Sequence, residues 1–233
     1  MQLNAGIDHV VYMGSQNIEP ELYQPTTKDF LKTRQVQLWI ETDTPGDLRL
    51  GKYFQDSGVL VYLPHSVQNL WDPHFWLSPS HMELLAEEIY SYLGLHDPKH
   101  KYNYTKNYVL LKSIISKTET DIKKQLGPIP GPLKRIVIVH PSLSLFCSEF
   151  KIKQIVISSE VGDPSLGHIL AIRAAIIKDH IGTVFIEPQF SARIAEEVIS
   201  GVPNTKLVSI NTLDTAWPTM MYSISSSIAA SLH

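Results

Sequence analysis

Between Asn103 and Leu126 the chain reads NYTKNYVLLKSIISKTETDIKKQL, and this stretch decides the fold. It contains neither glycine nor proline. Its apolar side chains recur at helical spacing, at Tyr108, Leu111, Ile114, Ile115 and Ile122. A helix over these residues would be about 36 Å long, at about 1.5 Å per residue. We expect it to be a spine that links two lobes; the alternative is a surface helix of one larger domain.

On both sides of this stretch, short β-branched runs alternate with segments of helical period. Strands are predicted near residues 9–13, 36–40, 59–63, 135–139, 154–157, 183–186 and 206–210. Helices are predicted near residues 28–32, 80–93, 166–180 and 191–199. This alternation predicts an α/β fold with mostly parallel sheets. The expected parts are a lobe at residues 1–102, the spine helix at 103–126 and a second lobe at 127–233.

The composition is that of an ordinary globular protein, with 233 residues, 43% hydrophobic and 18% charged. The net charge of −3 gives no basic footprint, so nucleic acid is not an expected partner. Cys147 is the single cysteine, so no disulfide can form within the chain. The start, MQLNAGIDHVVYM, does not resemble a signal peptide. This leaves open a cytoplasmic protein, or a mature or truncated form of an exported one.

Histidines and carboxylates follow several of the predicted strands. Because ligands bind beyond the carboxyl ends of parallel strands, these residues are candidates for a site. They are Glu19, Glu21, His65, His74, His140, Glu187, Asn211 and Asp214. Imidazole and carboxylate together suit zinc, iron or manganese. Each signal is weak alone, since a single histidine after a strand is more often a capping or hydrogen-bonding residue than a metal ligand.

Four motifs, in this order, resemble one family. DPHFWLSP at residues 72–79 resembles the DPHxWLDP signature of the metal-binding subunits of ABC importers, cluster A-I. EPELYQPT at 19–26 is similar to the family's DPHxYEPT, and IVHPSLSLF at 138–146 to its VxHPAFGYF. FIEPQFS at 185–191 matches its EPQFS. The resemblance extends over residues 7–213, which is nearly the whole chain.

The resemblance implies two α/β lobes joined by a rigid helix, with one metal ion in the cleft and two ligands from each lobe. By position, His74 and His140 are ligands. Glu21 stands where the family has its first histidine. Asn211 stands where an aspartate is expected, and Asp214, three residues on, could substitute for it. A carboxylate gained at Glu21 would offset the one lost at Asn211.

By the same resemblance, the chain is an extracytoplasmic solute-binding protein and not an enzyme. It would deliver its metal to an ABC permease driven by an ATPase. Zn2+ is favoured by His140, and Mn2+ or Fe2+ are the alternatives favoured by the carboxylates. We expect a monomer in the periplasm or otherwise outside the cytoplasm, possibly membrane-anchored, and the family's first strand and helix are not found in this sequence.

The expected ligands also predict a pH dependence. Neutral imidazoles are required, so metal affinity should fall below about pH 6.5. Each ligating histidine needs a partner on its other ring nitrogen, for which Asp72 and Glu187 are candidates. The alternative is that these two carboxylates only shape turns.

Two other functions fit the same residues. One is a metalloenzyme, in which Glu187 or Glu21 acts as a base on metal-bound water. The other is an adhesin-like interaction protein with a structural metal. Hydrolytic turnover would favour the first, and binding to matrix proteins that survives loss of His74 and His140 would favour the second.

Overall fold

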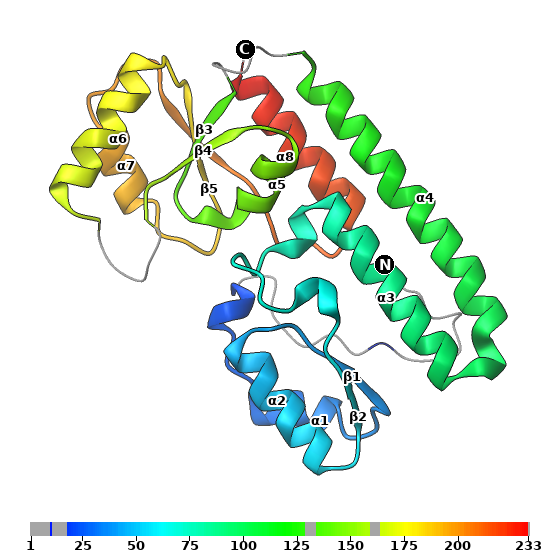
Figure 1. The fold of residues 1–233 in the computed structure, drawn as a ribbon. Helices are drawn as coiled ribbons and strands as arrows, with labels where there is room; N and C mark the ends of the chain where they lie inside the picture. Colours follow the sequence, from blue (N-terminus) through cyan, green and yellow to red (C-terminus); the bar gives the residue numbers. More distant parts are fainter. Residues whose placement is uncertain (1–9, 11–17, 129–133, 159–163, 233) are drawn as a thin grey trace. The chain divides into compact units, whose positions relative to one another are not determined.

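The computed structural model describes residues 10, 18–128, 134–158 and 164–232, and the chain forms two compact units. The first is Met1–Ser116 and the second is Lys117–His233. The boundary falls inside helix α4, Lys101–Leu126, so this helix contributes residues to both units. The predicted long helix is therefore confirmed (Figure 1).

The first unit is built on two parallel strands, β1 (Leu38–Ile40) and β2 (Leu60–Tyr62). Its core contains Trp39 and Phe54, whose rings are stacked with centroids 4.7 Å apart. Helices α1, α2 and α3 span Thr27–Lys32, Pro45–Asp56 and Pro79–His96. Short 3₁₀ helices lie at Pro20–Leu22, His65–Val67, Phe75–Leu77 and Pro98–His100.

The second unit contains a four-stranded parallel sheet of order β4-β3-β5-β6. The strands are β3 (Arg135–Ile138), β4 (Lys153–Val156), β5 (Thr183–Ile186) and β6 (Lys206–Ser209). The helices are α5 (Ser144–Glu149), α6 (Leu166–Lys178), α7 (Arg193–Ile199) and α8 (Trp217–Ser231). Figure 1 shows α6 and α7 on one side of this sheet and α5 and α8 on the other.

Burial explains why β3 and β5 are the central strands of that sheet. All four residues of β5, TVFI, are buried, as are three of the four in β3. Continuous apolar runs of this kind are typical of parallel strands covered on both faces. The next residues after these strands are Val139-His140 and Glu187, which places polar side chains at one end of the sheet.

Most predicted elements are confirmed, with bounds that shift by up to three residues. The strand predicted at residues 9–13 lies outside the described residues except for Val10. Three helices were not predicted, namely α2, α5 and α8.

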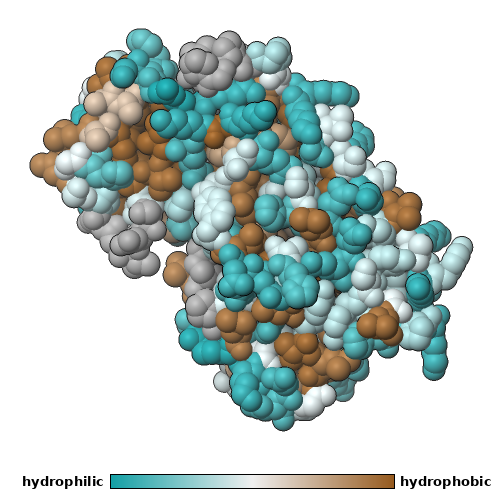
Figure 2. Space-filling model, in the orientation of Figure 1, coloured by the Kyte–Doolittle hydropathy of each residue, from teal (hydrophilic) through white to brown (hydrophobic). Residues whose placement is uncertain are grey.

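Apolar side chains remain on parts of the surface. On α6, Leu166, Leu170 and Ile177 are exposed, and Figure 2 shows hydrophobic residues over this helix. Among the described residues, no helix combines the length and the hydropathy needed to span a bilayer.

Candidate metal site

The segment WDPHFWLSP forms a compact turn that carries His74, a buried side chain. The Asp72 carboxylate accepts a hydrogen bond from the His74 backbone N–H at 2.9 Å, closing an Asx turn around Pro73. One 3₁₀ turn follows, Phe75–Leu77. Ser78 then caps helix α3, since its hydroxyl accepts from the His81 N–H, and Pro79 occupies the first helical position.

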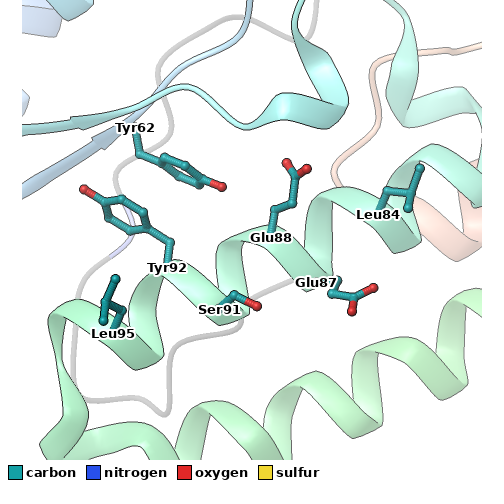
Figure 3. A pocket seen from close by; sticks show the side chains of 7 residues that line it. All are labelled: Tyr62, Leu84, Glu87, Glu88, Ser91, Tyr92 and Leu95. Atoms are coloured by element: carbon teal, nitrogen blue, oxygen red, sulfur yellow. The ribbon is translucent and has the colours of Figure 1, made fainter.

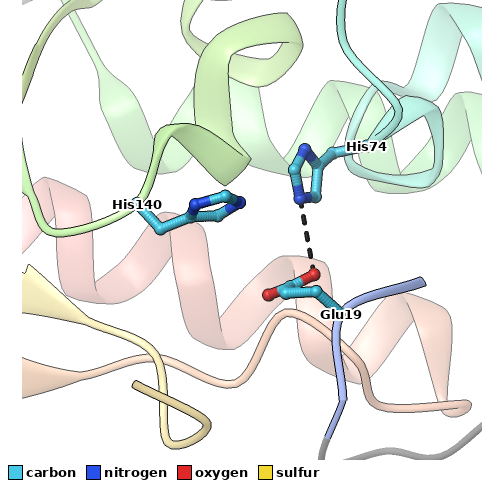
Figure 4. Close-up of side chains that lie close together, drawn as sticks. All are labelled: Glu19, His74 and His140. Atoms are coloured by element: carbon cyan, nitrogen blue, oxygen red, sulfur yellow. Dashed lines mark ion pairs between the residues drawn. The ribbon is translucent and has the colours of Figure 1, made fainter. Parts of the chain in front are cut away.

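The imidazole of His74 lies between two carboxylates. Its Nδ1 is 2.6 Å from Oδ1 of Asp72, and its Nε2 is 3.4 Å from Oε2 of Glu19 (Figure 4). The three side chains are buried, with exposed fractions of 3% or less. Asp72 is thereby confirmed as the partner of the second ring nitrogen. A carboxylate on Nδ1 holds the ring so that Nε2 is directed to a ligand, which is the usual arrangement at metal-bound histidines.

These two carboxylates control the protonation of His74. Burial disfavours the imidazolium, but the hydrogen bonds and charges of Asp72 and Glu19 outweigh it and raise the pKa of His74 to about 9. The metal-free ring is therefore protonated at neutral pH. A metal ion that binds at Nε2 would have to displace this proton, so with this raised pKa we expect metal affinity to begin to fall at a higher pH than the ordinary histidine pKa predicts.

The carboxylate beside Nε2 of His74 is that of Glu19, which the sequence analysis did not select as a ligand. Glu19 precedes Pro20 and has the extended backbone that a following proline favours. Its carbonyl accepts from the Leu22 N–H at 2.9 Å, which starts the 3₁₀ helix Pro20–Leu22. Glu21, the predicted ligand, belongs to this 3₁₀ helix, but its side chain lies outside what the structure describes. The motif EPE held both residues, and alignment with the family's DPH directed attention to the second.

In the second unit, His140 directly follows strand β3 and its neighbour Val139. It is half-buried, and its ring is stacked on that of Phe190, with centroids 4.7 Å apart and planes at 28°. Its carbonyl accepts from the Ser142 N–H at 2.9 Å. His140 therefore lies at the end of a central strand, as predicted, and an aromatic ring supports its imidazole.

Glu187 lies at the end of the adjacent strand β5 and is fully buried. Its Oε1 accepts a hydrogen bond from the Ser142 hydroxyl. Its carbonyl accepts from the Phe190 N–H at 3.0 Å, which closes the turn EPQF. Glu187 thus bonds both to the loop that follows His140 and to the turn that carries Phe190.

Asn211 and Asp214, the two candidate oxygen donors, lie in the loop between β6 and α8. Asn211 is exposed, and its Oδ1 accepts from the Leu213 N–H at 3.0 Å. Asp214 is half-buried, and its Oδ1 accepts from the Ala216 N–H at 2.8 Å. Each side chain therefore already shapes a turn, and metal ligation by either would have to accommodate that hydrogen bond.

A separate hollow of about 460 Å³ lies beside α3 in the first unit (Figure 3). Tyr62 and Tyr92 stack across it with centroids 4.0 Å apart. Glu88 accepts hydrogen bonds from the backbone N–H and the hydroxyl of Ser66. The polar groups of the hollow thus fasten the 3₁₀ helix His65–Val67, which precedes the His74 turn, to α3.

Taken separately, the two units define an α/β protein with parallel sheets and with imidazole and carboxylate donors of the kind that bind transition metals. Residues 8–231 match the family described as "ZnuA: Zinc-uptake complex component A periplasmic", and the chain belongs to that family. The resemblance that the motifs indicated is therefore confirmed.

Characterised relatives are similar to this chain at low identity. The zinc uptake protein ZnuA of Brucella abortus is 29% identical over 134 residues, which cover 56% of this chain and 39% of that protein. The iron-binding protein YfeA of Yersinia pestis is 23% identical over 193 residues, which cover 76% of this chain and 61% of that protein. The metal ABC transporter lipoprotein SloC of Streptococcus mutans is 25% identical, covering 79% and 68%. The alignment thus spans about two-fifths of the length of the Brucella relative.

Solved structures confirm the fold. A crystal structure of ZnuA superposes with a TM-score of 0.87 at 20% identity, covering 99% of this chain and 93% of that one. The periplasmic zinc-binding protein TroA of Treponema pallidum gives 0.78 at 16% identity, covering 93% and 88%. The predicted α/β class, with parallel sheets and a long helix, is that of these two-lobe proteins.

Proposed function

We propose that this protein captures a divalent transition metal outside the cytoplasm and passes it to an ABC permease driven by an ATPase. The metal is cargo, bound by Glu19 and His74 of the first unit and His140 of the second, with an oxygen from Asn211 or Asp214. Family membership supports the transport role. The observation that carries the site is the buried Asp72–His74–Glu19 array.

The donor set supports zinc as the preferred cargo. Two imidazoles and one or two carboxylate oxygens make a four-coordinate site of the type that Zn2+ forms. Carboxylates also suit Mn2+ and Fe2+, and one relative is named as iron-binding, so these remain the alternatives. Glu21 is the alternative carboxylate, since it lies two residues from Glu19 in the same motif.

Capture on this proposal is an exchange of a proton for a metal ion. In the metal-free protein, the His74 imidazolium is paired with Glu19 and Asp72. The metal takes the Nε2 lone pair once that proton leaves, while Asp72 keeps its hydrogen bond to Nδ1. No catalytic step is assigned, and we expect the protein to act as a monomer.

Titration of chelator-treated protein with zinc, manganese and iron(II) tests this proposal. The wild type should bind one zinc ion with submicromolar affinity, and the His74→Ala, His140→Ala double variant should lose that binding. Exposed His96 and His168 provide a matched double-alanine control that should retain it. Tighter binding of manganese or iron would change the cargo but keep the role. Absence of binding by the wild type, or equal binding by the double variant, would contradict the site.

A further inference from the structure

We propose that Glu187 is a positioning residue for His140, acting through Ser142 and Phe190; the proposal rests on the proposed role of His140 as a metal ligand. Glu187 is fully buried at the carboxyl end of β5, beside the strand that leads to His140. Its side chain accepts a hydrogen bond from Ser142 in the loop after His140, and its backbone carbonyl accepts one from Phe190, on whose ring His140 stacks. One residue thereby fixes both the loop and the ring.

The first contact acts on the backbone of the histidine loop. The Ser142 hydroxyl donates to Glu187 Oε1, and the Ser142 N–H donates to the His140 carbonyl at 2.9 Å. Ser142 is fully buried, so solvent cannot replace its hydroxyl partner. The hydrogen bond from Ser142 to Glu187 joins the segments that follow β3 and β5. It therefore holds the 3₁₀ turn Pro141–Leu143 in the position that sets the direction of the His140 side chain.

The second contact acts on the ring. The Glu187 carbonyl accepts from the Phe190 N–H at 3.0 Å, and Pro188 is the next residue, as is common in β-turns. This turn presents the Phe190 ring, on which the His140 imidazole stacks. Glu187 thus contacts the His140 loop through its side chain and the Phe190 turn through its backbone. Removing the side-chain bond to Ser142 leaves the backbone contact in place but releases the His140 loop, so the imidazole should lose the orientation needed by a metal.

The test compares two ways of removing this link. Glu187→Ala and Ser142→Ala each delete the side-chain hydrogen bond, whereas Glu187→Gln has nearly the same shape and keeps an acceptor oxygen. Zinc affinity, measured by chelator competition, should weaken about tenfold to 100-fold in the alanine variants, a range typical of groups that orient metal ligands. The variant that combines Glu187→Ala with Ser142→Ala should bind zinc no more weakly than the weaker-binding of the two single variants, because both remove the same hydrogen bond. Glu187→Gln should stay within about threefold of wild type, since the acceptor remains.

Two controls separate positioning from a general loss of structure. Exposed Glu197→Ala should leave zinc affinity unchanged. In a His140→Ala background, none of the Glu187 or Ser142 substitutions should weaken zinc further. The proposal would be overturned if Glu187→Gln and Glu187→Ala lost equal zinc affinity while Ser142→Ala lost none. It would also be overturned if these substitutions still weakened zinc binding in the His140→Ala background.

A readout without metal keeps this inference distinct from the proposed function. The Phe190 ring shifts the NMR signals of the His140 ring protons because the two rings are stacked. In metal-free protein those signals should move in Ser142→Ala and Glu187→Ala and stay in place in Glu187→Gln. Unmoved signals in the alanine variants would overturn the positioning role. A wild type that shows these shifts but binds no zinc would overturn only the proposed function.

Discussion

At the scale of single residues, the chemistry is concentrated on His74. The sequence identified this histidine through DPHFW, and Asp72 as its partner, because both positions are fixed by a short local motif. It included Glu19 among the candidates but did not select it as a ligand, because the contact to His74 joins residues that are 55 positions apart and only the folded chain brings them together. Similarity to the family selected Glu21 instead, by motif position. The contact between His74 and Asp72, two residues apart, was therefore predictable from the sequence, and the contact between His74 and Glu19 was not.

Asp72→Asn should weaken metal binding without unfolding the protein. Asparagine can still accept the His74 backbone N–H and keep the turn, but it cannot support the ring as a charged acceptor. We expect zinc affinity to fall about tenfold to 100-fold and the His74 pKa to drop from about 9. Histidine NMR titration and zinc competition measure the two effects. Asp56→Asn, at an exposed position of α2, is the control, and an Asp72→Asn protein that binds zinc as wild type contradicts this role.

The elevated pKa of His74 also predicts how stability depends on pH. Because the folded-state pKa of about 9 exceeds the ordinary value of about 6.5, protonated His74 stabilises the metal-free fold fully below about pH 6.5. This contribution is lost as the pH rises through about 9. Zinc requires the neutral ring, so the stabilisation by zinc should increase over the same window, by at most about 1.4 kcal/mol per pH unit.

Thermal unfolding with and without saturating zinc measures this directly. The difference in Tm between the two forms should grow from pH 6.5 to pH 9. In metal-free His74→Ala, the decline of stability over this window should be reduced. A zinc-dependent Tm difference that is flat or that shrinks with rising pH would contradict the assigned pKa.

At the scale of elements, the strands were predictable and some helices were not. Apolar β-branched runs marked β3 to β6, most clearly the central strands β3 and β5, which are buried as expected for parallel strands covered on both faces. Helix α2 begins Pro45-Gly46 and reads as a turn, although Thr44 caps it by accepting from the Asp47 N–H. Helix α8 contains the serines of YSISSS, which are poor helix formers, so only its buried residues reveal the period: Met220, Met221, Ile224 and Ile228.

Helix α4 should be sensitive on its buried face in both units. Ile115 belongs to the first unit and Ile122 to the second, and they are 1% and 0% exposed. Truncation of either to alanine should lower the free energy of unfolding by about 2–5 kcal/mol. Leu110→Ala, at a position 61% exposed on the same helix, is the control and should cost far less. Denaturant unfolding tests this, and equal costs at the three positions would contradict the assignment of the buried face.

Gly51 in α2 should resist a substitution that usually stabilises helices. A Cβ there would lie 1.7 Å from Oε2 of Glu41, a buried carboxyl whose pKa is raised by burial and by the charge of Asp47. Gly51→Ala should therefore destabilise by about 1–3 kcal/mol. Gly167→Ala in α6 meets open space and should stabilise by up to about 1 kcal/mol.

Denaturant unfolding of these two glycine variants gives the comparison. Glu41→Ala combined with Gly51→Ala should recover stability relative to Gly51→Ala alone, since the clash is removed. A stabilising effect of Gly51→Ala in the otherwise wild-type chain would show that Glu41 moves aside without cost.

At the scale of the whole molecule, function on this account requires donors from two units that fold around separate sheets. The long helix between them could be predicted because it lacks helix breakers over its whole length. The ligand set of the second unit could be predicted only in part. His140 follows a strand and matches a motif, but Asn211 and Asp214 each serve a local turn, and motif position does not distinguish between them.

The most direct test of the central claim is X-ray absorption spectroscopy at the zinc edge on the one-to-one zinc complex. The account predicts two imidazoles and one or two oxygen ligands in the first coordination sphere, with Zn–N distances of about 2.0–2.1 Å. One imidazole should be lost in His74→Ala and one in His140→Ala. A wild-type spectrum with a single imidazole, or one that does not change in His140→Ala, would contradict binding of the metal by both units.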